Sequence, residues 1–541
     1  MPSPKLTVIG LDAATFDVID PLVAAGRLPN IARILEEGTG GVLRSTTHPL
    51  TPHAWSTMVT GVNAGRHGIW DFIERGDSGY DLRVINGSYR RAPAVWDRLA
   101  RSGRRVGLVN IPFTWPAPGV DGFAIAGMDA GGREKGMTHP AGLVDELRER
   151  FSPLELDHRF PVTKGGDADL DFVRRAAEQK VETTLWLAER FEPELLWVVF
   201  MAADHIHHVA WPDWDERGAE SSVAETYRIL DEAVGKLHEA AGGNDVVLVS
   251  DHGGGSLKGV VNLNAWLARE GFLQYTKGTE RLGRKLLDAI IARRRHLPKA
   301  LRYRVKQRAG GLRERMYERE QYSVVDWPRT RAFSYGSFGS IVVNLRGRER
   351  DGVVEPGEEY ERVRSEIAAK ALELTDPDGE RIVAAVHKRE DLFDGPELEK
   401  IPDLLIEFRD YEWLGKGNFT SRAESIWDTI ELEPGSKHAY VGSHRHEGIF
   451  ALAGPSATHG ARTAIGIEDV APTVLYLLGE KIPVDLEGRL VMEAIDPELL
   501  DSRPPEYDES APFALDHDAE GYAPEEAEEV ERRLRGLGYI E

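Results

Sequence analysis

Three aspartates, Asp12, Asp204 and Asp251, stand at positions where an α/β protein can carry out metal chemistry. Each lies at the carboxyl end of a short apolar run that is typical of a buried strand, and open α/β sheets bind their ligands at that edge. A single aspartate at such a place is about as often a helix cap or a turn former. Three of them, two with a histidine close by, favour a metal site.

Two of these aspartates have histidines at informative spacings. Asp204 and His208 are four residues apart, so on a helical turn they share one face and can bind one ion. Asp251 and His252 are adjacent, and the three glycines that follow (253–255) allow the sharp backbone that adjacent ligands need. Both pairs therefore predict metal ligands.

A further histidine-rich stretch, Gly-Ser-His-Arg-His, places His444 and His446 just before the apolar run 448–453. Mixed aspartate and histidine ligands suit a borderline divalent ion. We therefore expect two divalent metal ions as cofactors, with zinc as the first expectation and manganese as the second.

Thr51 opens a stretch that is typical of a short capped helix. Thr51 is a good N-cap residue, Pro52 a good first helical residue and Gly61 a good residue just after the helix. Capping alone would explain this threonine. The same position also suits a nucleophile, because a helix N-terminus favours an anion such as phosphate. A threonine hydroxyl there can attack phosphate once a metal or a base lowers its pKa.

Several segments, taken in order along the chain, resemble the alkaline phosphatase superfamily. The resemblance is to the bacterial branch grouped with type I phosphodiesterases and nucleotide pyrophosphatases, whose members are described as phosphohydrolases or phosphomutases. The segments are VIGLDAATFD (8–17), LTPHAWSTMVTGVNAGRHGIWDF (50–72), Asp204 with His208, SDHGGG (250–255), GSHRHEGIFALAGP (442–455) and IEDVAPTVLYLLG (467–479).

The resemblance implies a role for each position. The implied ligands are Asp12, Asp251 and His252 for one metal ion, and Asp204, His208 and His444 for the other. Thr51 would bridge the two ions and attack phosphorus, and water would then release phosphate from a phospho-threonine intermediate. The motif position favours His444 over His446. Two divalent ions, three carboxylates and a Thr51 alkoxide sum to a nearly neutral site that can accept phosphate oxygens.

One position departs from the family pattern. Related nucleotide pyrophosphatases place an asparagine shortly after the His-Gly pair, where it contacts a phosphate oxygen, whereas here Phe72 stands in that place after His67 and Gly68. The resemblance therefore assigns no substrate-binding residue outside the metal ligands. The polar residues whose positions could supply that contact are Arg44, His48, His53 and Asn110.

Three other histidines receive a structural interpretation. His67 is expected to pack or cap near a turn, as loop histidines mostly do. His205 and His207 point away from the face that Asp204 and His208 share, so we expect them to be neighbours of the ligands and not ligands.

The segments that carry and separate these residues alternate between expected strands and expected helices. The expected strands are 5–12, 105–112, 194–204, 245–251, 340–345, 403–408 and 448–453. The expected helices are 51–61, 92–102, 170–190, 219–241 and 360–374. This alternation predicts an α/β fold with a mostly parallel central sheet flanked by helices. The resemblance makes it an alkaline-phosphatase-like core with inserted cap segments.

The expected division of the chain follows from where the alternation breaks. It is 1–275 for the first part of the catalytic core, 276–325 for a basic helical insertion or cap, 326–351 for core, 352–400 for an α+β insertion, 401–495 for the last part of the core and 496–541 for an acidic C-terminal tail. From residue 277 to residue 320 there are 15 Lys or Arg against 5 Asp or Glu.

Composition narrows the function classes. The chain has 541 residues and no cysteine, which excludes disulfides, thiolate metal sites, cysteine nucleophiles and a sulfatase that makes formylglycine from cysteine. The formal net charge of -23 argues against general nucleic-acid binding. No signal peptide and no apolar run of membrane-spanning length is recognisable, so the expected location is cytoplasmic.

Three functions remain open at this point. The first is a two-metal phosphohydrolase that acts on a small phosphomonoester or phosphodiester. The second is a phosphomutase or phosphoryl transferase of the same superfamily, in which the cap segments would exclude water. The third is an added role in which the basic insertion binds an anionic partner or makes peripheral membrane contact. Neither the substrate nor the oligomeric state follows from the sequence.

Overall fold

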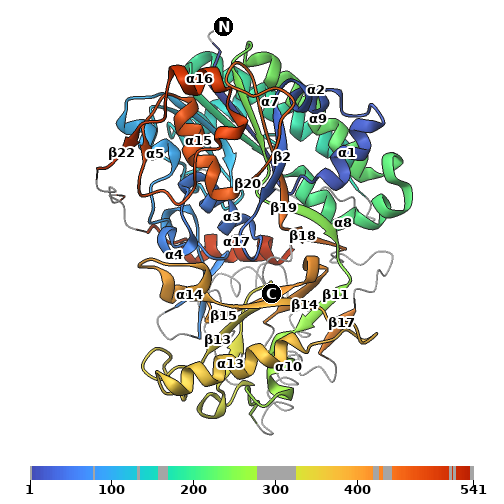
Figure 1. Ribbon diagram of the computed structural model, residues 1–541, viewed down its shortest axis with the longest axis vertical. Coiled ribbons are helices and arrows are strands. Elements are labelled where there is room, and N and C mark those ends of the chain that lie inside the picture. The colour runs from blue at the N-terminus through green and yellow to red at the C-terminus, as the bar shows by residue number, and fades with distance from the viewer. Residues whose placement is uncertain are drawn as a thin grey trace, which may run out of the picture.

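Five of the predicted strands, those at 5–12, 105–112, 194–204, 245–251 and 448–453, pair within one large sheet in a computed structural model of the protein. The predicted strands at 340–345 and 403–408 lie in a separate sheet. The structure describes residues 3–76, 80–130, 135–155, 168–276, 324–417, 426–429, 441–510, 515 and 519–536. Figure 1 shows a larger lobe built on this sheet and a smaller lobe beneath it. The smaller lobe comprises residues 259–276, 324–417 and 426–429.

The large sheet has nine strands in the order β20-β2-β19-β9-β1-β8-β5-β6-β7. Their bounds are β1 (Leu6–Leu11), β2 (Thr39–Arg44), β5 (Val106–Ile111), β6 (Gly122–Ala126), β7 (Thr138–His139), β8 (Leu195–Phe200), β9 (Asp245–Val249), β19 (Glu447–Ala453) and β20 (Arg462–Gly466). The five central strands β9, β1, β8, β5 and β6 are parallel, and β19 runs antiparallel to both of its neighbours. The predicted mostly parallel sheet is therefore confirmed.

Helices cover both faces of this sheet. Their bounds are α1 (Phe16–Ala24), α2 (Pro29–Glu37), α3 (Thr51–Thr60), α4 (Ala64–His67), α5 (Val95–Arg101), α6 (Leu143–Arg150), α7 (Leu170–Phe191), α8 (Ala202–Arg217), α9 (Ser222–Ala240), α15 (Val470–Leu477), α16 (Pro497–Ser502) and α17 (Pro524–Gly536). Strand β1 shows why both faces are apolar. Leu6 and Val8 join the core beneath α3, α5 and α15, whereas Ile9 and Leu11 join the core beneath α1, α2, α7 and α9.

The smaller lobe contains two further sheets, with the strand orders β12-β13-β15-β14 and β16-β11-β17. Their bounds are β11 (Gly259–Asn262), β12 (Ala332–Ser334), β13 (Ser340–Val343), β14 (Val383–Lys388), β15 (Leu404–Phe408), β16 (Trp413–Lys416) and β17 (Trp427–Thr429). Its helices are α10 (Leu263–Arg269), α13 (Glu358–Leu372) and α14 (Arg389–Leu392). Short pairs complete the strands: β3 (Ile73–Arg75) with β4 (Leu82–Val84), β10 (Gly253–Ser256) with β18 (Gly442–Arg445), and β21 (Ile482–Pro483) with β22 (Tyr507–Asp508).

This lobe differs from the predicted division of the chain. Segments 326–351 and 401–416 were expected in the core, yet their strands β12, β13 and β15 form one sheet with β14 of the expected insertion, in which β15 pairs directly with β14. The reason is that antiparallel pairing joins strands far apart in sequence, which local patterns do not reveal. The basic insertion 276–325 lies outside the described residues except for 276, 324 and 325.

The C-terminal region is more than the expected acidic tail. Val530 and Leu534 of α17 are buried in the main core, and the ring of Tyr522 stacks on Trp115 at 4.8 Å between ring centres.

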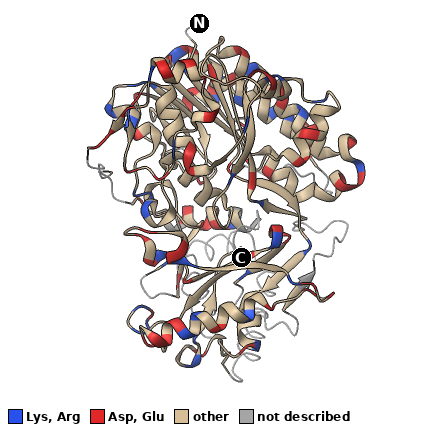
Figure 2. Ribbon diagram, in the orientation of Figure 1, with Lys and Arg blue, Asp and Glu red and all other residues tan. Residues whose placement is uncertain are grey.

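Figure 2 shows most charged residues on the outer helices and turns, with the central strands almost free of them. Among the described residues, no helix combines the length and the apolar character that crossing a bilayer requires.

Candidate active site

The carboxyl ends of β9, β1 and β8 bring the three predicted aspartates together. Asp12 directly follows β1, Asp251 lies two residues beyond β9, and Asp204 lies in the first turn of α8, which begins just after β8. All three side chains are fully buried. Parallel neighbouring strands end at the same edge, so residues more than 200 positions apart meet there.

Asp12, Asp251 and His252 form the first cluster, in which one ligand atom of each lies within 4.8 Å of the others. The indole N–H of Trp55 donates to Asp12 Oδ2 at 2.7 Å, and the backbone N–H of Ala13 donates to Asp251 Oδ1 at 3.3 Å. His252 Nε2 lies 3.2 Å from Asp251 Oδ2 and 3.8 Å from Asp12 Oδ1. These contacts fix the outer carboxylate oxygens and turn the inner ones toward the imidazole.

Asp204, His208 and His444 form the second cluster. Asp204 Oδ1 lies 3.2 Å from His208 Nε2 and 3.3 Å from His444 Nε2, and the two Nε2 atoms are 3.0 Å apart. Ligands about 2.0–2.1 Å from a tetrahedral ion are about 3.3 Å from one another, so these spacings suit one such ion. The ring of His444 stacks on that of His252 at 3.8 Å, which joins the clusters.

The tautomer of each histidine follows from its backbone partner. The Nδ1 atoms of His208, His252 and His444 face the carbonyl oxygens of Gly442, Gly253 and Pro49, respectively. A carbonyl only accepts, so each Nδ1 carries the proton and donates it. When such a ring is neutral, it presents its Nε2 lone pair to the cluster, as in metal-binding histidines whose other nitrogen bonds to a backbone carbonyl.

The electrostatics of the site also fit divalent cations. Burial raises the pKa of Asp251 well above its ordinary value, and the nearby charge of Asp204 adds to this effect. Burial alone would raise the pKa of Asp204, but the rings of His208 and His444 hold it well below its ordinary value. Within the described part of the chain, Asp251 Oδ2 and His252 Nε2 are buried without a hydrogen-bond partner. A divalent cation would coordinate these unbonded atoms, and mixed aspartate and histidine ligands suit such an ion.

Thr51 is the first residue of α3 and not its N-cap, which is Leu50. Pro52 accordingly stands at the second helical position, and Gly61 ends the helix in the left-handed conformation as predicted. The predicted capping role of Thr51 is wrong, since its buried Oγ1 has no hydrogen-bond partner among the described residues. The hydroxyl is therefore not used to hold the helix together.

Two contacts tie α3 to the clusters. Trp55, one helical turn after Thr51, bonds Asp12, and Pro49, two residues before Thr51, accepts the proton of His444. Thr51 therefore lies on a segment that is attached to both clusters. Sequence reasoning missed Trp55, although its i, i+4 spacing from Thr51 places both on one helix face.

Trp55 provides a test of the first cluster. Trp55→Phe keeps an aromatic ring but removes the N–H that orients Asp12, so we expect zinc affinity at one site to fall by about 10–100-fold. Calorimetric zinc titration of chelator-treated protein measures this. Trp96→Phe is the matched control, because Trp96 is fully buried and its indole nitrogen has no hydrogen-bond partner among the described residues. Equal zinc affinity in both variants would contradict the orienting role of Trp55.

The glycines after His252 serve a purpose other than the one predicted. Residues 253–256 form strand β10, and none of the three glycines has a positive φ. A Cβ on Gly254 would lie 2.1 Å from His207 Nδ1, and one on Gly255 would lie 2.3 Å from Arg445 Nε. The glycines therefore allow α8 and β18, which carry His208 and His444, to approach closely.

The remaining histidines take positions around the site. His207 Nε2 lies 3.2 Å from the hydroxyl of Tyr227, and His67 Nε2 donates to Thr57 Oγ1 at 3.0 Å while its Nδ1 accepts from the backbone of Ile69. His446 faces the carboxylate of Glu407 at 3.6 Å. Among these, the structure gives His67 and His207 contacts of the kind expected for structural residues.

The four polar residues proposed for phosphate contact are scattered. Arg44 is exposed at the end of β2, and Asn110 Nδ2 donates to the Ala126 carbonyl at 2.8 Å. His48 and His53 are fully buried beside Trp70, at ring-centre distances of 5.5 and 4.9 Å. Phe72, which stands where the family pattern has asparagine, is buried, and its ring centre lies 5.7 Å from that of Phe113.

The smaller lobe supplies an aromatic contact that the sequence did not predict. Phe338 lies between β12 and β13, and its ring centre is 5.3 Å from that of His444. The loop adopts a left-handed backbone at Phe338, with a φ of 71°, and at the nearby residues Gly336 and Gly339. The glycine spacing indicates a turn, but only the assembled lobes show that the turn faces the cluster of Asp204, His208 and His444.

Comparison with known proteins agrees with this fold. The family model described as type I phosphodiesterase / nucleotide pyrophosphatase matches residues 6–440. Phosphonoacetate hydrolase from Sinorhizobium meliloti 1021, solved in complex with phosphonoformate, superposes with a TM-score of 0.51 at 15% identity, over 88% of this chain and 95% of that one. This likeness confirms the predicted α/β fold.

Two further matches are weaker or local. Murine ectonucleotide pyrophosphatase / phosphodiesterase 5 aligns with a TM-score of 0.49 at 13% identity, over 91% of this chain and 100% of that chain. Ribosomal RNA small subunit methyltransferase F from Shewanella sp. (strain MR-7) is 38% identical over 104 residues, which are 18% of this chain. The matched region spans only about a fifth (21%) of that curated relative.

Proposed function

Because the chain belongs to the type I phosphodiesterase / nucleotide pyrophosphatase family, we propose that it is a two-metal phosphohydrolase that cleaves a small phosphomonoester or phosphodiester. One observation carries the proposal. Three imidazoles with inward-facing Nε2 atoms and three buried aspartates meet at one sheet edge, and the helix attached to them begins with a threonine hydroxyl that no described residue engages.

We assign the ligands to two ions as the family resemblance implies, and His252 lies close enough to group with Asp204 and His444 as well. Asp12, Asp251 and His252 would hold one ion. Asp204, His208 and His444 would hold the other. When bound, two divalent ions would supply Lewis-acid chemistry, lowering the pKa of a nearby hydroxyl and stabilising charge on phosphate oxygens. The nitrogen-rich second cluster and its tetrahedral spacing favour zinc over manganese.

Thr51 is the proposed nucleophile. Its Oγ1 loses a proton and forms a bond to phosphorus, while the bond from phosphorus to the leaving-group oxygen breaks and that oxygen gains a proton. Water then loses a proton and forms a new bond to phosphorus, and the bond to Thr51 Oγ1 breaks, so that Oγ1 regains its proton and phosphate or a phosphomonoester is released. The N-terminus of the ten-residue helix α3 favours the negative charge of the phosphoryl group at this place.

A phosphoryl transferase is the second candidate. Phe338 of the smaller lobe packs on His444, so that lobe borders the site and could limit the access of water. In that case the phosphoryl group on Thr51 would pass to a hydroxyl of a second substrate. Added alcohols would compete with water for the intermediate, and the ratio of phosphorylated alcohol to free phosphate would separate the two functions.

Metal removal tests the proposal directly. We expect a strong chelator to abolish hydrolysis of chromogenic phosphate monoesters and diesters, and two equivalents of zinc per chain to restore it. The ratio of the two restored rates assigns a monoesterase or a diesterase. Full activity after complete metal removal, measured by elemental analysis, would exclude the two-metal mechanism. Magnesium added alone serves as the control, because oxygen-preferring Mg²⁺ is a poor match for histidine-rich ligands.

A further inference from the structure

His48 lies between β2 and the nucleophile helix and adopts an unusual backbone conformation. Its φ is 58°, in the left-handed region that residues with a Cβ rarely occupy, and its side chain is fully buried. Such a conformation persists only where the surroundings hold it in place. The contacts of His48 should therefore reveal what holds it.

Two hydrogen bonds connect His48 to the smaller lobe. Its Nε2 lies 3.1 Å from the Ile406 carbonyl of β15, and its backbone N–H donates to the Tyr411 hydroxyl at 3.1 Å. Burial lowers the pKa of His48 to about 3, so the ring is neutral at pH 7, and Nε2 must carry the proton because a carbonyl only accepts. The rings of Phe338 and Tyr411 enclose it at 6.3 Å.

The residues that follow His48 belong to the proposed active site. The His48 carbonyl accepts the backbone N–H of Leu50 at 2.8 Å, which closes a tight turn. Within this turn, Pro49 accepts the proton of His444 Nδ1, and Thr51 comes directly after it. This short turn therefore links the smaller lobe, a metal-ligand histidine and the start of the nucleophile helix.

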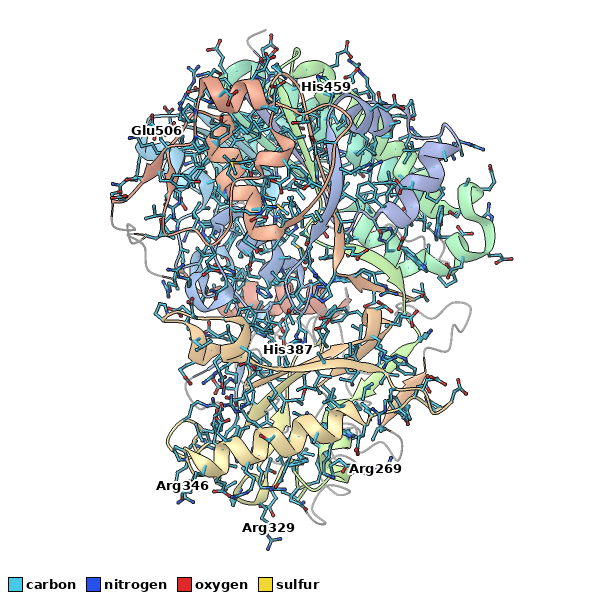
Figure 3. The ribbon with its side chains drawn as sticks, in the orientation of Figure 1. Arg269, Arg329, Arg346, His387, His459 and Glu506 are labelled. Carbon is cyan, nitrogen blue, oxygen red and sulfur yellow. The ribbon has the colours of Figure 1, made fainter. Side chains whose placement is uncertain are left out.

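The contact between the two lobes around this link is polar where it is partly exposed to solvent. His446 of the larger lobe faces Glu407 of β15, which also bonds His387 Nε2 at 2.8 Å. Figure 3 shows His387 on the side of the smaller lobe that faces the larger one. His48 itself lies deeper than this group, because its side chain is fully buried whereas His387, Glu407 and His446 are about a quarter exposed.

We propose that His48 is a positioning residue that makes the placement of Thr51 and His444 depend on the seating of the smaller lobe. If the lobe shifts, the bonds at Ile406 and Tyr411 move the turn, and the turn moves the Pro49 carbonyl and the first residue of α3. Displacement of a nucleophile by about 1 Å can cost about 100-fold in rate. This inference rests on the proposed function of Thr51, although the mechanical link can be measured without turnover.

Four variants separate this role from general stability. His48→Asn keeps a residue that tolerates the left-handed backbone but cannot reach the Ile406 carbonyl, whereas His48→Gln keeps a distal N–H donor. Tyr411→Phe removes the hydroxyl that accepts from His48. Tyr80→Phe is the matched control, because its hydroxyl joins the β3–β4 hairpin to Asn344 of the smaller lobe at 2.6 Å, away from the turn.

We expect His48→Asn to lower kcat by about 10–100-fold with KM changed less than about threefold and two zinc ions per chain retained. His48→Gln should recover most of the rate. Tyr411→Phe should lower kcat as well, and its effect should not add to that of His48→Asn, because both break one link. Tyr80→Phe should leave kcat unchanged. Unchanged kcat in His48→Asn, or an equal loss in Tyr80→Phe, would overturn the proposal.

Hydrogen exchange gives a readout that does not depend on catalysis. Backbone amides of residues 48–54 should exchange faster in His48→Asn and Tyr411→Phe than in the wild type, and at the wild-type rate in Tyr80→Phe. If the wild-type protein hydrolyses no phosphate ester, the proposed function fails, yet the exchange rates still decide whether His48 holds the turn. Wild-type exchange rates in His48→Asn would contradict the link in either case.

Discussion

Thr51→Ala is expected to lower turnover by about 10⁴-fold or more while two zinc ions remain bound to each chain. The Thr51 hydroxyl is the group that would form the covalent bond to phosphorus, and it makes no hydrogen bond to a described residue that the substitution could break. The methyl side chain of alanine fits the buried position, so folding should be preserved. Steady-state kinetics and elemental analysis of the same preparation measure both quantities.

Two controls make this prediction specific. Thr51→Ser keeps a hydroxyl at the same place and should retain activity within about tenfold. Thr57→Ala removes another buried threonine hydroxyl of α3, one that bonds His67, and should reduce stability more than rate. Acid quenching of wild-type turnover should trap phosphate on the peptide that contains Thr51, as mass spectrometry can detect. A fully active Thr51→Ala variant would exclude the covalent mechanism.

Asp251→Asn is expected to have opposite effects on activity and on the stability of the metal-free protein. The amide is a poor ligand for zinc, so hydrolysis should fall on the order of 10³-fold or more. Without metal, however, the wild-type carboxyl destabilises the folded protein. It is fully buried, lies near Asp204 and has one oxygen without a hydrogen-bond partner in the described structure. A neutral amide of the same shape removes this cost.

The pH dependence fixes the sign of the stability effect. Because burial raises the folded-state pKa of Asp251, the metal-free wild type loses stability as pH rises above the unfolded value of about 3.9 toward the raised folded value. The amide of the Asp251→Asn variant cannot titrate. The stability of the variant relative to that of the metal-free wild type should therefore increase as pH rises over this window. Chemical unfolding in excess chelator between about pH 4 and pH 8 measures the difference.

Zinc should reverse the order of stability. A bound ion stabilises the folded wild type by mass action, and the variant lacks a ligand for it. We therefore expect zinc to raise the Tm of the wild type by more than that of Asp251→Asn. Asp245→Asn is a matched control, because Asp245 is buried but bonds the backbone and hydroxyl of Ser456, outside both clusters. If Asp251→Asn bound zinc as tightly as the wild type, Asp251 would not be a ligand.

Short-range patterns in the sequence were enough to predict the elements and the local residue pairs of the candidate site. Apolar runs shorter than a helix placed Asp12 and Asp251 at strand ends, and four-residue spacing placed Asp204 and His208 on one helix face. These features follow from chain geometry over a few residues, so periodicity is enough to read them. The observed β1, β5, β8, β9 and β19 lie within about four residues of their predicted bounds.

How the two lobes meet and what each residue contacts could be seen only in the folded chain. Local patterns could not show that β12, β13 and β15 join β14 in one sheet, that Gly254 leaves room for His207, or that Leu50 takes the N-cap position expected of Thr51. The link from His48 to Ile406 spans 358 residues of sequence. Such contacts depend on the register and packing of distant segments, and these are set by the burial of the whole chain and not by any short stretch of it.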